Sequence, residues 1–133
     1  MLRIKQAQLD HFANRQRGRF VKLMVDYLRA EMPAMVRSMD DAALERWMRG
    51  ALAKCEKYGV DTEPEAAQLT LLLLLLGLDA DDRSAWVREA LAVDKRPIGK
   101  VRRLVDGCRA HGIEGLDDVL VFESMAEKES VEA

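Results

Sequence analysis

The chain has 133 residues, the length of one ordinary globular domain. Hydrophobic residues make up 49% of it, and its 21 basic and 23 acidic side chains leave a formal net charge of −2. This composition excludes a disordered or fibrous chain, and it provides no overall positive field that would attract nucleic acid or an anionic membrane. Because the sequence turns polar at Arg3, no secretory signal is predicted, and we expect a cytoplasmic protein.

Charge is distributed unevenly along the chain. Residues 1–50 carry 10 basic and 6 acidic side chains, residues 51–113 carry 10 of each, and residues 114–133 carry 1 basic and 7 acidic ones. The simplest interpretation is a set of ordinary solvated faces. The alternative is that the acidic end folds back on a basic face, or that one of the two ends binds a partner.

Helical hydrophobic spacing recurs from one end of the sequence to the other, and no segment has the pattern of a convincing strand. Glycines, prolines and capping side chains mark the helix ends. The predicted helices cover residues 6–31, 34–39, 41–58, 63–76, 84–93, 97–111 and 116–125. We therefore predict an all-α fold, a single-domain bundle of about five to seven helices over residues 1–126, with a frayed acidic tail over 127–133.

Six consecutive leucines occupy residues 71–76. The apolar run over residues 70–78 would form a helix about 13 Å long, less than half of a bilayer core of about 30 Å, so it cannot span a membrane. Thr62 and Glu65 have the spacing of a capping box that would begin this helix, and Gly77 would end it. A helix that is apolar on every side belongs at the centre of a bundle, so we predict that residues 71–76 are nearly all buried.

The apolar residues of the other helices are expected to face the core, because they recur at helical spacing. These are Leu9, Phe12, Phe20, Leu23, Met24 and Tyr27 in the first helix, Leu44, Trp47 or Met48, Ala51 and Cys55 in the third, Trp86, Ala90 and Val93 after the leucine helix, and Ile98, Val101, Leu104, Val105 and Cys108 in the next.

The spacing of Cys108 and His111 is that of a metal-ligand pair or of a nucleophile with its base. A structural zinc site needs four ligands, and the other cysteine and histidine residues, Cys55 and His11, belong to other elements. No third orienting group accompanies a Cys–His pair. We therefore expect two free thiols, a histidine that caps its helix, and neither a catalytic residue, a metal site nor a cofactor.

Three further segments resemble parts of known binding motifs. Residues 79–82 begin like a calcium loop, but a serine and an alanine stand where that loop needs glycine and glutamate, and helix capping explains the aspartates better. Gly99 and Lys100 lack the rest of a phosphate-binding loop. A helix-turn-helix over residues 63–94 would offer Arg88 as the cation of its second helix, so DNA binding is not expected.

Two segments of the N-terminal half are candidate surfaces for a protein partner. One is the basic stretch of the first helix, and the other is a methionine-rich segment around Pro33, since methionine packs adaptably at binding surfaces. The alternative is that most of these methionines fill the core. The candidate partner-binding residues are Arg15, Arg17, Arg19, Met32, Met35 and Met39.

The order of these features resembles small all-helical proteins encoded beside type VI secretion effector and spike genes in proteobacteria. The resemblance covers roughly residues 4–105 and consists of helix-packing and turn positions. They are Ile4-x-x-x-Gln8-Leu9, Phe20-Val21-x-x-Met24-Val25-x-Tyr27-Leu28-Arg29, Met32-Pro33, Lys57-Tyr58-Gly59-Val60-Asp61-Thr62-Glu63, Leu76-Gly77-Leu78-Asp79 and Trp86.

This resemblance implies a non-enzymatic accessory role, such as an adaptor or co-chaperone that binds an effector, a toxin or a component of the secretion spike. The main alternative is an immunity protein that neutralises a cognate toxin through its acidic residues, those at 79–82 or those of the tail. A helix-turn-helix regulator is a third and weaker hypothesis.

Overall fold

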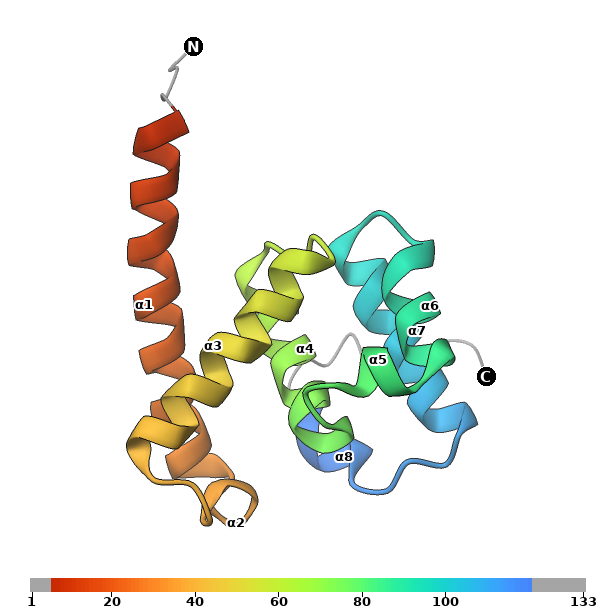
Figure 1. Cartoon of the computed structure of the whole chain (residues 1–133). Coiled ribbons are helices and arrows are strands. Elements are labelled where there is room, and N and C mark those ends of the chain that lie inside the picture. The colour runs from red at the N-terminus through yellow and green to blue at the C-terminus, as the bar shows by residue number, and fades with distance from the viewer. Residues whose placement is uncertain (1–5, 121–133) are drawn as a thin grey trace. The chain divides into compact units, whose positions relative to one another are not determined.

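The computed structural model describes residues 6–120, with side chains from residue 17 onward, and every regular element in that range is a helix (Figure 1). The all-α prediction is confirmed. The helices are α1 (Gln6–Glu31), α2 (Pro33–Val36), α3 (Asp41–Lys57), α4 (Glu63–Leu76), α5 (Ala80–Arg83), α6 (Ala85–Val93), α7 (Pro97–Ala110) and α8 (Leu116–Val119). The predicted acidic tail lies outside the described residues.

The chain divides into two compact units, Met1–Leu52 and Ala53–Ala133, and the boundary between them falls within α3. Each unit is described by itself. No helix in residues 6–120 combines the length and the apolar character that crossing a bilayer requires.

In the first unit, α1 buries Phe20, Val21, Met24 and Leu28. This row differs from the predicted one, because Leu23 is 48% exposed. The reason is geometric: Leu23 lies about 120° around the helix from the centre of the buried row, whereas Leu28 lies near its centre. The predicted positions Leu9 and Phe12 lie outside the described side chains.

Pro33 begins α2, where its missing N–H costs nothing, and Asp40 then caps the start of α3 by accepting a hydrogen bond of 2.7 Å from the N–H of Ala43. Along α3, Leu44, Met48, Ala51 and Cys55 are fully buried. The predicted inner face of this helix is confirmed, with Met48 rather than Trp47 as its buried member.

In the second unit, α4 packs against α7 and α8, and α7 also packs against α6. Gly59 and Gly77 follow α3 and α4 with positive φ angles of 71° and 107°, so the predicted helix ends are confirmed. Thr62 is the N-cap of α4, but its side chain makes no capping hydrogen bond there, so the predicted capping box is not formed.

The leucine run is buried in its first half only. Leu71, Leu72 and Leu73 are buried, whereas the leucines at 74–76 and Leu78 are half-buried. The prediction that nearly all six are buried is therefore wrong for the last turn of α4, which lies at the end of the helix and is not fully covered.

Helix α6 also differs from its prediction. Its buried residues are Val87 and Leu91, whereas Trp86 and Ala90 are half-buried and Val93 is 61% exposed. Helix α6 carries two apolar rows, and the row of Val87 and Leu91 is buried instead of the predicted row. In α7 the predicted row is confirmed for Val101, Leu104, Val105 and Cys108, which are buried, whereas Ile98 in the first turn is half-buried.

Candidate functional site

The methionine-rich segment forms a sharp turn between α1 and α3, which we call the α2 corner (residues 32–39). Arg29, in the last turn of α1, holds it from within. Its Nη1 donates a hydrogen bond of 3.0 Å to the carbonyl oxygen of Val36, and its Nη2 donates one of 2.6 Å to that of Met39. Nη2 also lies 3.1 Å from Oδ1 of Asp41. One guanidinium therefore binds the carbonyl at the end of α2, which also accepts a hydrogen bond from the N–H of Met39, and the carbonyl of Met39 that follows.

The outer side of the α2 corner is hollowed. Pro33, Ala34 and Arg37 are exposed, and together with Arg29 they line an open depression of about 500 Å³. Arg37 makes no hydrogen bond or ion pair with the part of the chain that the structure describes, so its charge is presented to solvent. The α2 corner thus combines a fixed backbone with a small apolar surface and one exposed cation.

The structure places the predicted methionines in this corner and the predicted arginines near the middle of α1. Met32, Met35 and Met39 are all half-buried, so they support the turn more than they form its surface. Arg17 and Arg19 are exposed on α1, whereas the side chain of Arg15 lies outside the described residues.

Sequence reasoning missed Arg37 and the role of Arg29. The role of Arg29 could have been predicted from its position: it is a basic residue in the last turn of a long helix, one turn before a proline, and there its side chain can reach backbone carbonyls of the following turn.

The second unit contains a buried carboxylate. Asp81 is 1% exposed, and its two oxygens accept hydrogen bonds from Nζ of Lys54 (2.7 Å), Nζ of Lys57 (3.3 Å) and Oη of Tyr58 (2.6 Å). Burial alone would raise the pKa of Asp81, but these hydrogen bonds outweigh it and lower the pKa to about 2. Burial and the bond to Asp81 raise the pKa of Tyr58 to about 12.

The aspartates at 79–82 were predicted to cap the helix that follows. Asp79 is the N-cap residue of α5, but its side chain makes no capping hydrogen bond. The exposed carboxylates form ion pairs, since Nε of Arg83 lies 2.9 Å from Oδ1 of Asp79 and Nζ of Lys54 lies 3.3 Å from Oδ2 of Asp82. Every donor around Asp81 is satisfied, and none of the described hollows opens on it. We interpret this cluster as a structural link between the end of α3 and α5.

Cys108 and His111 do not act together. The His111 ring stacks on Trp86, with centroids 4.3 Å apart, and its Nδ1 lies 2.9 Å from the carbonyl oxygen of Gly107. Cys55 and Cys108 are buried free thiols, as predicted, and burial raises their pKa values to about 12 and about 11. Neither thiol is therefore a ready nucleophile at neutral pH. Within residues 6–120, no cluster of metal-ligating side chains is found.

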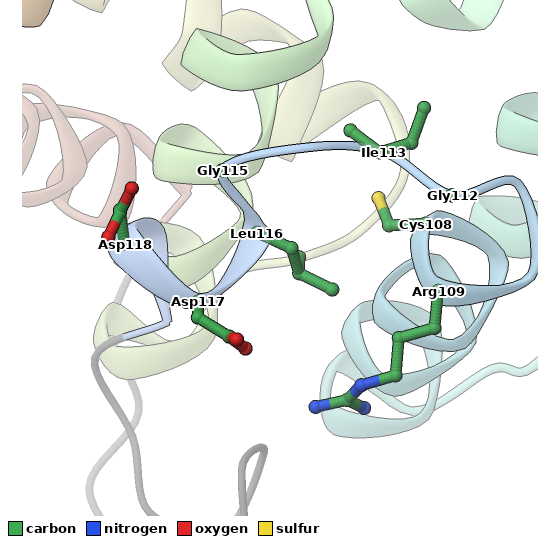
Figure 2. A pocket seen from close by; sticks show the side chains of 8 residues that line it. All are labelled: Cys108, Arg109, Gly112, Ile113, Gly115, Leu116, Asp117 and Asp118. Atoms are coloured by element: carbon green, nitrogen blue, oxygen red, sulfur yellow. The ribbon is translucent and has the colours of Figure 1, made fainter.

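A second hollow, of about 530 Å³, lies between the end of α7 and α8 (Figure 2). Cys108 and Leu116 line its interior, and Arg109 and Asp117 stand at its sides. Its surface is mainly polar, and Arg109 is already engaged, lying 4.0 Å from Asp106. These residues have no arrangement that points to a ligand.

A third hollow, of about 300 Å³, lies between two neighbouring helices, and we call it the α6–α7 groove. Trp86, Glu89, Ala90 and Val93 form its α6 side, and Arg103, Asp106 and His111 form its other side. Gly107 makes room for the Trp86 ring, because a Cβ at residue 107 would lie 2.6 Å from Cζ3 of Trp86. The groove combines an aromatic side chain, an exposed valine and charges of both signs.

Comparison of the chain with protein-family models, with curated protein sequences and with solved structures finds no match.

Proposed function

We propose that this chain is a non-enzymatic accessory protein that binds another protein through its first unit, as a cytoplasmic adaptor or co-chaperone for a type VI secretion effector or spike component. The observation that carries the proposal is the α2 corner. Its backbone is fixed by Arg29 before any partner arrives, while Pro33, Ala34 and Arg37 remain exposed around an open hollow. A preorganised surface binds at a lower entropic cost than a flexible one.

The exposed charges of α1 and of the α2 corner define the partner that would fit. Arg19 and Lys22 are exposed on the same side of α1 as Leu23, and Arg37 is exposed on the corner itself. A partner with a small apolar patch and acidic groups at its rim would cover the apolar residues, and its charges would be steered by these cations. The secretion context rests on the resemblance of residues 4–105.

The alternative of an immunity protein receives less support. The acidic segment that would meet a basic toxin site is largely engaged within the chain, since Asp81 is buried and the carboxylates of Asp79 and Asp82 pair with Arg83 and Lys54. A helix-turn-helix function is also less favoured, because Arg88 of α6 donates a hydrogen bond to the carbonyl oxygen of Asp81.

The proposal is tested by co-expressing the full chain with each product of its neighbouring genes and isolating stable complexes. Two variants alter the exposed surface without touching the core, Ala34→Glu and Arg37→Glu. Lys95→Glu is the matched control, because Lys95 is an exposed cation of the second unit. We expect one neighbour to co-purify with the wild-type chain and with Lys95→Glu, and to be lost with both corner variants.

The same strains separate the alternatives. A stable complex that leaves the toxicity of the neighbour unchanged supports the adaptor, whereas rescue from toxicity by this chain alone would establish immunity instead. If no neighbour binds and the protein shifts DNA with a steep dependence on salt, the proposal is wrong.

A further inference from the structure

The α6–α7 groove presents apolar side chains of the second unit that its own helices do not fully cover. Helix α6 packs on the unit through Val87 and Leu91, so its second apolar row, Trp86, Ala90 and Val93, faces outward. Val93 is one of two large hydrophobic residues that are exposed in the described part of the chain. A half-buried tryptophan beside an exposed valine is typical of a protein interface, where tryptophan is enriched among the residues that dominate binding.

The two sides of the groove carry opposite charges. Helices α6 and α7 are joined by three residues and run antiparallel (Figure 1). The Trp86 ring packs against Gly107 across the groove. One turn along from this contact, Glu89 of α6 stands level with Arg103 of α7. The charge of Asp106 is balanced by Arg109, which lies 4.0 Å away. A partner of uniform charge would be attracted to one side and repelled by the other.

We propose that the occupant of the α6–α7 groove is the same groove of a second copy of this chain. A two-fold axis that runs along the groove places α6 of each copy over α7 of the other, at the same level. Glu89 of one copy then meets Arg103 of the other, and the symmetry makes this contact twice. The exposed Val93 and the half-buried Ala90 are covered by the same contact.

The dimensions of the groove predict a weak dimer. Helix α6 has 9 residues and α7 has 14, which correspond to lengths of about 14 Å and about 21 Å. Two such helices cover less than the roughly 800 Å² per partner of a standard stable interface. The dimer is therefore expected to form and dissociate with concentration, with a Kd on the order of micromolar or weaker.

The experiment is sedimentation velocity of the full chain over a concentration series, with charge-reversal variants. Glu89→Arg and Arg103→Glu each place like charges across the interface, and we expect each to weaken the dimer about tenfold or more. The double variant restores opposite charges and is expected to return the Kd to within about threefold of wild type. Glu114→Arg and Arg46→Glu are the matched controls, because both residues are exposed and neither lines the groove.

Recovery in the double variant cannot arise from misfolding, so it supports the groove specifically. A wild-type chain that sediments at its 15.0 kDa monomer mass at every concentration overturns the proposal. So does a dimer that is unaffected by the single reversals, or one that the double variant fails to restore. Partner capture at the α2 corner concerns the other unit, so its success or failure leaves this test unchanged.

Discussion

At the scale of single residues, the second unit contains two buried charged groups, Asp81 and Lys100, that have hydrogen-bond partners within the chain. The carboxylate of Asp81 accepts hydrogen bonds from two ammonium groups and from a phenol hydroxyl. Lys100 is also buried, and it donates a hydrogen bond of 2.6 Å to the carbonyl oxygen of Leu91 near the end of α6. A buried charge is tolerated when its partners are in place and becomes costly when one of them is removed. Such residues are therefore sensitive points of the fold.

Replacing Asp81 with asparagine is expected to destabilise the chain by about 1.5–3 kcal/mol, because Lys54 keeps only its longer contact with Asp82 and the donors Lys57 and Tyr58 lose a charged acceptor. The free energy of unfolding in urea measures this change. Asp117→Asn is the control, since Asp117 is exposed, and its effect should stay within about 0.5 kcal/mol. Equal effects of the two substitutions would show that the Asp81 cluster contributes nothing to stability.

Asp81 also makes stability depend on pH at the acidic end. Its pKa is about 2 in the folded chain, against about 3.9 for an unfolded aspartate, so the unfolded chain binds the proton more readily. The stability contributed by Asp81 is complete above about pH 4 and is lost as the pH falls through about 2. Urea unfolding at a series of pH values should therefore show that, below about pH 4, the free energy of unfolding falls less steeply with decreasing pH for Asp81→Asn than for wild type. The same dependence on pH in both chains would contradict the lowered pKa of Asp81.

Gly107 is required by the Trp86 ring rather than by its own backbone. In Gly107→Ala the new methyl group would overlap that ring, so the substitution is expected to cost about 1–3 kcal/mol. Gly18→Ala provides the opposite control, because no heavy atom lies within 4 Å of its Cβ position, and it should stabilise α1 by about 0.5–1 kcal/mol. Thermal unfolding followed by circular dichroism distinguishes the two, and a stabilising Gly107→Ala would show that Trp86 lies elsewhere.

At the scale of helices, the leucine helix α4 has two different halves. It packs against α7 and α8, and Leu75 of its last turn lies beside Gly115 at the start of α8, yet the leucines of that turn keep part of their surface exposed. The sequence of a short leucine run does not show where its burial by other helices ends, since every position has the same side chain. The boundary depends on which helices return to pack on it, and the sequence of the run does not contain that information.

The two halves should respond differently to truncation. Leu72→Ala removes a fully buried side chain and is expected to cost about 3 kcal/mol, including the cavity that it leaves. Leu74→Ala removes a half-buried one and should cost about 1–2 kcal/mol. Chemical unfolding of both variants checks the difference. A larger loss from Leu74→Ala would mean that the last turn of α4 is the more tightly packed half.

Helix α6 shows a second reason why prediction from periodicity is incomplete. Trp86, Ala90 and Val93 form an apolar row, and so do Val87 and Leu91, with an offset of about 100°. Either row could face the core. The structure buries the smaller side chains of Val87 and Leu91 and leaves the tryptophan at the edge, where Gly107 and His111 receive it. Neither contact is visible in the local sequence of α6.

At the scale of the whole molecule, most helix positions and their ends follow from the sequence. The bounds of α1, the cap at Asp40 and the glycines that end α3 and α4 are all determined by local backbone chemistry. The candidate surfaces are harder to predict from the sequence, because they depend on side chains that come into contact only after folding. Arg29 reaches carbonyls that lie 7 and 10 residues further along, and that contact makes the α2 corner a fixed surface.

The measurement that tests the proposed function most directly is the affinity of the captured partner for variants of the α2 corner, determined by isothermal titration calorimetry. We predict that Ala34→Glu and Arg37→Glu each weaken binding at least about tenfold, while Lys95→Glu binds like wild type. Equal affinities for all four chains would place the binding surface elsewhere and contradict the role assigned to the corner.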